Sequence, residues 1–370
     1  GGIRQSGNFS EKPCLIATYF SNIMNFKINN HLIGSGQPAY IIAEMSANHN
    51  QSFDQAVKII EAAKEAGADA IKLQTYTPDT LTIDCDNEYF RIKGTLWEGK
   101  TLYELYKEAY TPWEWQPKLQ KIAQKLNIDF FSTPFDNTAI EFLEKMNIPA
   151  YKVASFENVD MLLLRRIAQT GKPVIMSTGM ATLEEINEAV NAVHEAGCSQ
   201  LALLKCTSAY PAPPEEMNLR TISNLIETFT IPVGLSDHSL ELAIPVAAVA
   251  LGASIIEKHF TLSRNESGPD SSFSLEPREF KNMVDAVRTT EKSLGSIRYN
   301  AGKHEESSRI FRRSIFVVGD VKADEQFTPE NLRVIRPSDG LPPKYYDVIL
   351  GKTASRDIKR GSPMSWELMQ

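Results

Sequence analysis

Eight short runs rich in apolar and β-branched residues recur along the chain, with amphipathic helical stretches between them. The runs lie at residues 40–45, 70–75, 129–134, 150–155, 173–178, 201–208, 232–238 and 255–261. The clearest helical patterns lie at residues 53–66, 115–126, 137–146 and 183–196. Alternation of strands with helices predicts a parallel sheet in which the helices make the crossovers. Eight such units within roughly 250 residues predict a closed (β/α)8 barrel.

An open, doubly wound sheet is the competing topology. It would be expected to carry a glycine-rich phosphate-binding turn after its first strand. Residues 46–50 read SANHN, without a glycine, so we expect a TIM barrel. The long insertion at residues 76–112, rich in Tyr, Trp and Thr, follows the second strand. A loop of that length on a barrel usually forms part of the active-site mouth.

After Gly302 the pattern changes to short alternating polar and apolar segments. We expect a strand at 314–318, and the segments 321–332 and 358–369 resemble each other. A pseudo-repeat this short predicts a small β-rich domain, which is marginal on its own and gains stability by docking. The predicted domains are a barrel at 24–294, a linker at 295–309 and the small domain at 310–370. Because Met24 looks like a natural start, residues 1–23 are expected to be a tag or an upstream extension.

The overall composition argues against two classes of protein. Lys and Arg total 39 against 46 Asp and Glu, and a net charge of −7 is unlike the basic footprint of a nucleic-acid-binding protein. No apolar run approaches the roughly 20 residues of a membrane span. The four cysteines include no CxxC pair, so we expect reduced thiols and a cytoplasmic protein.

Two lysines, Lys72 and Lys152, stand inside apolar runs that should be buried. A buried ammonium group is costly unless an anion accompanies it. Because active sites form at the C-terminal ends of barrel strands, the two lysines are candidates for binding a phosphate group. The alternative is a structural ion pair with Glu44 or Glu257. The hydroxyls that would complete a phosphate site are those of Thr133, Ser155 and Ser236.

Two histidines, His238 and His259, end consecutive strands, which are neighbours in a barrel. Imidazoles on adjacent strands can reach one divalent cation, with water and substrate completing its coordination. Asp237 and Glu257 are candidates for a further ligand or for orienting the imidazoles. The alternative is that each histidine only forms hydrogen bonds within the barrel mouth.

Other residues near the predicted mouth are less specific. His49 is expected to orient Glu44 or to face a sugar. Aromatic residues in and after the insertion either line a sugar site or pack, and we favour packing for Tyr103 and Tyr106. The aromatic set is Trp97, Tyr103, Tyr106, Trp113 and Trp115.

As an ordered set, the motifs at the strand ends resemble the sialic acid synthase family. They are AEMSANHN at 43–50, IKLQTY at 71–76, STPFD at 132–136, YKVAS at 151–155, GLSDH at 234–238 and EKHFT at 257–261. The motifs GPD at 268–270 and RRS at 312–314 also match, and the tail, with VIRP at 334–337, is similar to the family's antifreeze-protein-like (SAF) domain. The resemblance runs from about Met24 to the C-terminus.

The resemblance implies a synthase that condenses phosphoenolpyruvate with an open-chain N-acetylated amino sugar and releases phosphate. It implies that His238 and His259 hold Mn2+, or Mg2+ or Co2+, and that Glu44 handles protons or orients water. It also implies a domain-swapped homodimer. The residues implied for phosphoenolpyruvate are Lys72, Thr133, Lys152, Ser155, Ser208 and Ser236, and those for the sugar are Glu157, Tyr210, Asp270 and Arg336.

The chain departs from the family's usual motifs at a few positions. Met45-Ser46-Ala47 replaces the Ile-Gly-Ile of N-acetylneuraminate synthases, Gln51 stands where a glycine is usual, and Ser208 stands where Asn is frequent. Segments 96–99, 102–106 and 111–115 resemble the pseudaminic acid synthase branch, which implies 2,4-diacetamido-2,4,6-trideoxy-altrose as the sugar. That 6-deoxy sugar carries a methyl group, which suits an aromatic loop.

Three other functions remain as alternatives. The first is a sister synthase making N-acetylneuraminic or legionaminic acid. The second is a noncatalytic sugar- or phosphate-binding barrel, which would be expected to lack the histidine pair or one of the lysines. The third is a metal-dependent hydrolase, which would be expected to show a richer ligand set such as His-x-His on the first strand.

Overall fold

The computed structural model describes residues 24–266 and 268–370. The chain divides into two compact units between Gly295 and Ser296, and each is described by itself. The segment 1–23, expected to be a tag or an upstream extension, lies outside the described residues. The first unit contains the barrel and the second contains the small C-terminal domain.

The barrel expected from the alternating pattern is confirmed. Its parallel strands close in the order β10-β3-β4-β5-β6-β7-β8-β9. The strands are β3 Tyr40–Glu44, β4 Ala70–Thr75, β5 Asp129–Pro134, β6 Tyr151–Val153, β7 Val174–Ser177, β8 Leu201–Cys206, β9 Val233–Asp237 and β10 Ile255–His259. A short antiparallel hairpin, β1 Phe26–Ile28 and β2 His31–Ile33, precedes them and was not predicted.

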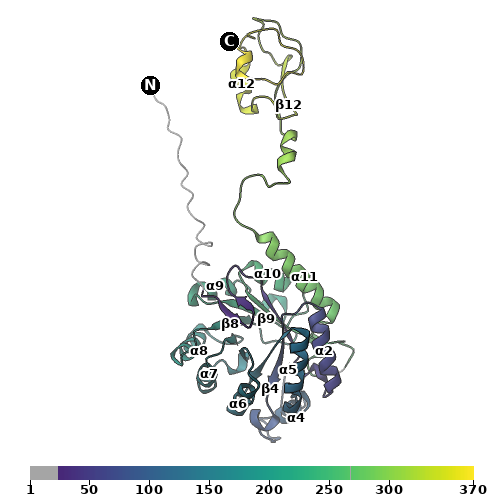
Figure 1. Ribbon diagram of the computed structural model, residues 1–370, viewed down its shortest axis with the longest axis vertical. Helices are drawn as coiled ribbons and strands as arrows, with labels where there is room; N and C mark the ends of the chain where they lie inside the picture. The colour runs from purple at the N-terminus through teal and green to yellow at the C-terminus, as the bar shows by residue number, and fades with distance from the viewer. Residues whose placement is uncertain (1–23, 267) are drawn as a thin grey trace. The chain divides into compact units, whose positions relative to one another are not determined.

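Helices surround the barrel strands (Figure 1). They are α2 Phe53–Glu65, α3 Pro78–Leu81, α4 Leu102–Ala109, α5 Gln116–Leu126, α6 Asn137–Met146, α7 Met161–Ala168, α8 Leu183–Glu195, α9 Thr221–Phe229, α10 Ala243–Ala250 and α11 Pro277–Leu294. Their apolar faces and the strands form one continuous core. None of the helices within 24–266 and 268–370 is long and apolar enough to cross a membrane.

Most strands end one or two residues before their apolar runs do, and β6 and β8 are examples. The run at 150–155 yields only β6, because Ser155 begins a short 3-10 turn, η4 Ser155–Glu157. The run at 201–208 ends as a strand at Cys206. In both cases the polar residues that close the run leave the hydrogen-bonded ladder, and the chain there turns into the loops at the C-terminal end of the barrel.

The register of the strands sets which polar side chains become neighbours. On one side of β3, Glu44 lies opposite His259 of β10, and on the other it lies opposite Lys72 of β4. Between β9 and β10, Ser236 lies opposite Glu257. Because neighbouring parallel strands are only about 4.8 Å apart, these pairings place the polar groups at one level of the barrel mouth.

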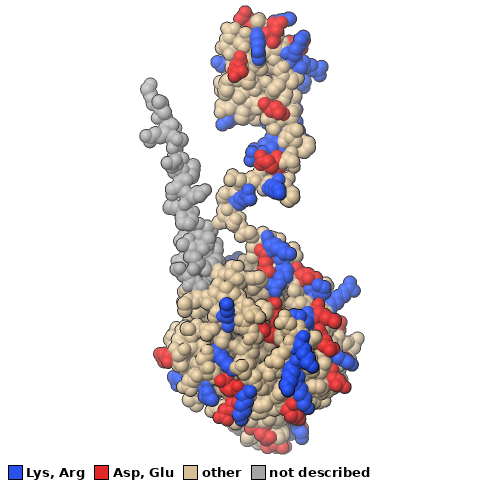
Figure 2. All heavy atoms as spheres, viewed as in Figure 1, with Lys and Arg blue, Asp and Glu red and all other residues tan. Residues whose placement is uncertain are grey.

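The C-terminal unit is a small β-rich domain, as expected. Its antiparallel strands are β11 Ser314–Val317 and β12 Leu332–Ile335, followed by the short helix α12 Tyr346–Ile349. The two resembling segments meet where Val321 and Ile358 exchange a pair of backbone hydrogen bonds of 2.9 and 2.8 Å. Over both units, basic and acidic side chains are interspersed on the face shown in Figure 2.

We predict that Gly234→Ala destabilises the barrel at β9, beside its neighbours β8 and β10. A Cβ at Gly234 would lie 2.3 Å from the backbone oxygen of Ile255 and 2.8 Å from Leu204 Cδ2, so β9 and its neighbours would have to move apart. Urea denaturation should show a loss of about 1–3 kcal/mol in the free energy of unfolding. The matched control is Gly302→Ala, whose Cβ would meet only Glu305 Oε2 at 3.5 Å. Equal stability of the two variants would contradict the prediction.

Candidate active site

A cavity of about 380 Å3 lies at the C-terminal end of the barrel. Most of the predicted site residues line it: Glu44, Lys72, Lys152, Ser155, Glu157, Tyr210, Ser236, His238, His259 and Asp270. Three predicted residues do not. Thr133 and Ser208 lie behind lining residues, in contact with Lys72 and Cys206 respectively. Arg336 directly follows β12 in the C-terminal unit.

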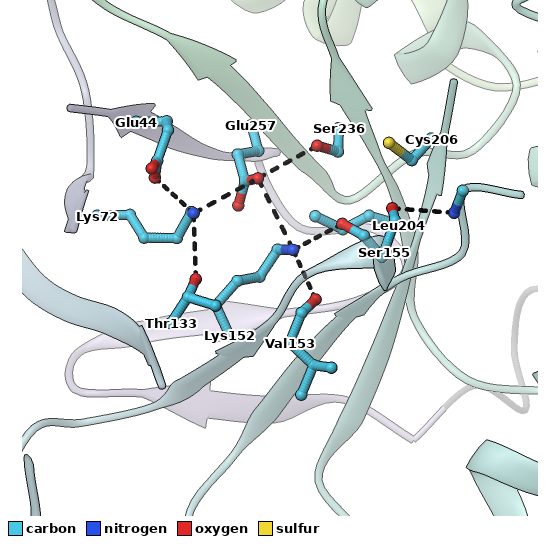
Figure 3. A network of polar contacts seen from close by, with 12 residues as sticks. Glu44, Lys72, Thr133, Lys152, Val153, Ser155, Leu204, Cys206, Ser236 and Glu257 are labelled. Carbon is cyan, nitrogen blue, oxygen red and sulfur yellow. Dashed lines mark hydrogen bonds and ion pairs between the residues drawn. The ribbon is translucent and has the colours of Figure 1, made fainter. Parts of the chain in front are cut away.

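The two buried lysines converge on one carboxylate, Glu257 (Figure 3). Lys72 Nζ lies 3.9 Å and Lys152 Nζ 3.8 Å from the same oxygen, Glu257 Oε1. Lys72 Nζ also lies 2.5 Å from Glu44 Oε2. The ion pairs with Glu44 and Glu257, which were the alternative to phosphate binding, are therefore formed. They coexist with the arrangement that a phosphate site needs, because both ammonium groups face one point of the cavity.

Hydroxyl groups complete the surroundings of the lysines. Lys72 Nζ donates to Thr133 Oγ1 at 3.3 Å, and Ser236 Oγ donates to Glu257 Oε1 at 3.2 Å. Lys152 Nζ donates to Ser177 Oγ at 2.6 Å. Ser177 was not among the predicted site residues, although its place at the end of a barrel strand was the available signal. The second oxygen, Glu257 Oε2, is buried and has no partner among the described residues.

Burial and mutual charge shape the titration of this cluster. Burial raises the pKa of Glu44, and the ammonium of Lys72 offsets only part of that rise. Burial also opposes the charge of Glu257, but Lys152 and Lys72 together hold the pKa of this carboxyl below its usual range. The pKa of Lys152 is lowered by burial, which Glu257 only partly offsets. Glu257 is thus the anion that balances both lysines.

The paired imidazoles lie together as predicted, with ring centroids 5.3 Å apart. His238 Nδ1 faces the carbonyl oxygen of Thr207 at 3.0 Å, so Nε2 would be the nitrogen that binds a cation. The neighbouring Cys206 outweighs the effect of burial and raises the pKa of His238. His259 Nδ1 is buried and has no partner among the described residues. Burial, followed by the charge of His238, moves the pKa of His259 well below its usual value. A neutral imidazole is the form that binds a metal.

These two histidines fit a divalent cation whose remaining ligands are water and substrate. Among residues 24–266 and 268–370, no group of three or more His, Cys, Asp or Glu could hold a metal ion. The interpretation of Asp237 as a further ligand is wrong, because its Oδ2 pairs with Lys258 Nζ at 2.5 Å. Asp237 and Lys258 project away from the cavity, as strand alternation requires for neighbours of lining residues.

The cavity continues from the lysines and imidazoles to two further carboxyls. Burial raises the pKa of Glu157 to about 7, and its Oε2 has no partner among the described residues. Burial also raises the pKa of Asp270, whose Oδ2 accepts hydrogen bonds from Ser46 Oγ at 2.5 Å and from Ala47 N at 3.3 Å. The ring of Tyr210 packs on His238 with centroids 4.3 Å apart. This end of the cavity offers acceptors to a ligand's hydroxyl and amide groups.

One wall of the cavity comes from the strap, the name used here for residues 77–112. Its lining is largely apolar and consists of Leu81, Ile92, Thr95, Trp97, Leu102, Leu105, Tyr106 and Ala109. Trp97 Nε1 donates to the backbone oxygen of Pro269 at 3.0 Å, so the strap is joined to the loop that carries Asp270. The expected location of the insertion at the mouth is confirmed.

Two sequence-based expectations need revision, and one residue that lines the cavity was not expected. Tyr106, expected to pack, both packs edge-on against Tyr76 at 5.7 Å and lines the cavity. His49 neither orients Glu44 nor lines the cavity. It is buried against Thr111, with Nε2 3.0 Å from Oγ1. Cys206 lines the cavity without any signal in the sequence, and the charge of His238 outweighs the effect of burial and lowers its pKa to about 6.

Comparisons with known proteins agree with this geometry. The NeuB family model matches residues 59–299, and the SAF domain model matches residues 312–368. The pseudaminic acid synthase of Campylobacter jejuni is 50% identical over 325 residues, which cover 88% of this chain and 95% of that protein. The pseudaminic acid synthase of Helicobacter pylori is 45% identical over 331 residues, covering 89% and 97%.

One solved structure has the same fold and is also similar in sequence. It is the N-acetylneuraminic acid (sialic acid) synthetase from Leptospira borgpetersenii in complex with citrate, with a TM-score of 0.69 and 32% identity over 77% of this chain and 95% of that one. The barrel, the polar cluster at its mouth and these similarities lead to one conclusion. The chain belongs to the NeuB family of sialic-type acid synthases, and it carries an SAF domain in its C-terminal unit.

Proposed function

We propose that the protein is a pseudaminic acid synthase. It condenses phosphoenolpyruvate with 2,4-diacetamido-2,4,6-trideoxy-altrose, releases phosphate and depends on a divalent cation, Mn2+ or else Mg2+ or Co2+. The observation that carries the proposal is the pair of buried ammonium groups, Lys72 and Lys152, facing one carboxylate beside two imidazoles. The two relatives above, named pseudaminic acid synthases, support the choice of sugar.

Phosphoenolpyruvate would bind where the two lysines converge. A phosphate group carries a charge of about −1.5 to −2 at neutral pH, which two ammonium groups can balance if Glu257 gives up part of its contact with them. Ser177 contacts Lys152, and Ser155 and Ser236 line the same cavity, so their hydroxyls would be short hydrogen-bond donors to the phosphate. The phosphate would thus take the place of Glu257 as partner of the lysines. Neither lysine would then be buried without an anion.

The charge of the cavity favours a bound cation. Four carboxyls line it, those of Glu44, Glu157, Glu257 and Asp270, against two ammonium groups. Adding phosphoenolpyruvate makes this balance more negative. Burial raises the pKa of three of the four carboxyls, which lessens their negative charge without removing it. A divalent cation held by His238 and His259 would supply the missing positive charge.

In the proposed reaction, different residues of the chain have separate roles. C3 of phosphoenolpyruvate bonds to the aldehyde carbon of the open-chain sugar, water adds at C2, and the C–O bond to phosphate breaks. Glu44, whose pKa burial raises, is placed to accept the proton of that water. His238 and His259 would hold the cation, which would supply Lewis acidity toward the aldehyde oxygen. Glu157, Tyr210 and Asp270 would hold the sugar's polar groups.

The strap supports a sugar that carries methyl groups. Leu81, Ile92, Leu102, Leu105 and Ala109 together form its apolar lining. A hydroxyl placed against that wall would lose its hydrogen bonds with water and regain few. A 6-deoxy sugar presents a methyl group there instead, which favours the pseudaminic branch over an N-acetylneuraminate synthase acting on a 6-hydroxy sugar.

Two further features stay proposals that rest on the family resemblance. One is an exchanged-domain homodimer. The other is a contact between Arg336 and the sugar's N-acetyl carbonyl. Sedimentation of the full chain addresses the first, and the sugar KM of an Arg336→Ala variant addresses the second.

Phosphate release from phosphoenolpyruvate tests the proposed substrate. With Mn2+, the diacetamido-trideoxy sugar should be used with a kcat/KM about 10-fold to 100-fold above that of N-acetylmannosamine, the range that an apolar pocket gives. Leu102→Ser should lower this ratio of kcat/KM values, because it places a hydroxyl in the apolar wall formed by the strap. The control Leu183→Ser, at an exposed position on α8, should leave it unchanged. A wild-type preference for N-acetylmannosamine would refute the substrate.

Metal removal tests the role of the imidazoles. Dialysis against a chelator should abolish phosphate release, and added Mn2+ should restore it. His259→Ala should stay inactive when Mn2+ is added back, whereas the control His194→Ala, on the exposed side of α8, should recover like the wild type. Near-normal turnover by metal-free enzyme or by His259→Ala would rule out the proposed cation.

A further inference from the structure

Ser46 adopts a backbone conformation that a serine rarely takes. It lies in the turn after β3 with a φ of +45° and is 5% exposed. Positive φ values bring Cβ into conflict with the backbone, so that non-glycine residues hold them only where the surroundings require it. Glycine would take such a φ without strain. The serine is therefore kept here despite its conformational cost.

The hydroxyl of Ser46 occupies the centre of a chain of hydrogen bonds. Ser46 Oγ donates to Asp270 Oδ2 at 2.5 Å and accepts from Gln74 Nε2 at 2.9 Å. Gln74 Nε2 also donates to Glu44 Oε1 at 3.1 Å. All four residues line the cavity. The chain thus links Asp270, at the sugar end, with Glu44, at the reacting end.

The directions of these bonds follow from the groups themselves. A hydroxyl has one proton, and Ser46 gives it to Asp270, so Gln74 has to act as the donor toward Ser46. Both N–H groups of the Gln74 amide are then used, which sets the orientation of its side chain. Asp270 is held through Oδ2 alone. Its Oδ1 makes no hydrogen bond within the part of the chain that the structure describes.

We propose that Ser46 is a positioning residue that orients Asp270 and Gln74 for the amino sugar and so contributes to the choice of sugar. This inference rests on the proposed function. The hydroxyl does not contact either lysine of the phosphoenolpyruvate end. Its loss should therefore affect the sugar and leave phosphoenolpyruvate binding nearly unchanged.

Two substitutions separate this role from a structural one. Ser46→Gly and Ser46→Ala both remove the hydroxyl, but only alanine keeps the strained φ. The glycine variant should therefore melt roughly 2 °C above the alanine variant. Both should raise the KM for 2,4-diacetamido-2,4,6-trideoxy-altrose by about 10-fold to 100-fold, the effect of losing a hydrogen bond to a charged group. The KM for phosphoenolpyruvate should change by less than about 2-fold.

Thr230 supplies a matched control. It is an exposed residue at the end of α9 with a φ of +55°, and it lies outside the cavity. Thr230→Gly should likewise melt above Thr230→Ala, while the kinetics of both variants match those of the wild type. This pair shows the effect of relieving a positive φ where no hydrogen-bond chain is involved.

The outcomes are distinct. Unchanged sugar KM in both Ser46 variants overturns the inference, and so does an equal rise in the KM values of sugar and phosphoenolpyruvate, which would indicate general damage to the site. If the wild type turns over the sugar and Ser46→Gly has the same kinetics, this inference is refuted but the proposed function is not. Failure of the wild type to release phosphate with any amino sugar refutes the proposed function, and this inference with it.

Discussion

Two buried ammonium groups share one carboxylate, and the arrangement of the barrel mouth follows from this constraint. Lys72 and Lys152 reach Glu257 from different strands, at 3.9 and 3.8 Å. Without anions these lysines would be very costly to bury. With Glu44 and Glu257 beside them, the protein can keep two ammonium groups inside a low-dielectric cavity. An incoming phosphate can then exchange with the carboxylates as partner of the lysines.

The closed sheet is what brings these groups together. The register places Glu44 between His259 and Lys72, and Ser236 beside Glu257. The strand β3 therefore connects the paired imidazoles with the buried lysines. The strap adds the third part of the site, an apolar wall tied by Trp97 to the loop of Asp270. Ser46 joins the parts, because its hydroxyl lies between Asp270 and Gln74, whose amide also contacts Glu44.

The sequence predicted the barrel and most of the residues that line the cavity. Once the barrel is known, the C-terminal ends of its strands must meet at the mouth, so their polar residues could be placed there. The sequence also predicted the helical stretch at 183–196, which forms α8. It could not predict contacts set by packing between distant segments. Tyr106 reaches the cavity only because the strap folds over it, and the pKa of Cys206 is lowered by His238, which follows a different strand, β9. Asp237 was misassigned because strand alternation turns it to Lys258, whereas residues 236 and 238 line the cavity.

Equilibrium binding of phosphoenolpyruvate tests the shared-carboxylate account most directly, because it involves no chemical step. Isothermal titration calorimetry in the presence of Mn2+ would compare the wild type with Lys152→Met and with Lys145→Met, a change at an exposed lysine on α6. Removing one member of a buried charge cluster should weaken binding by at least about 30-fold, and the exposed change should have no effect. Equal affinity of Lys152→Met and the wild type would contradict the account.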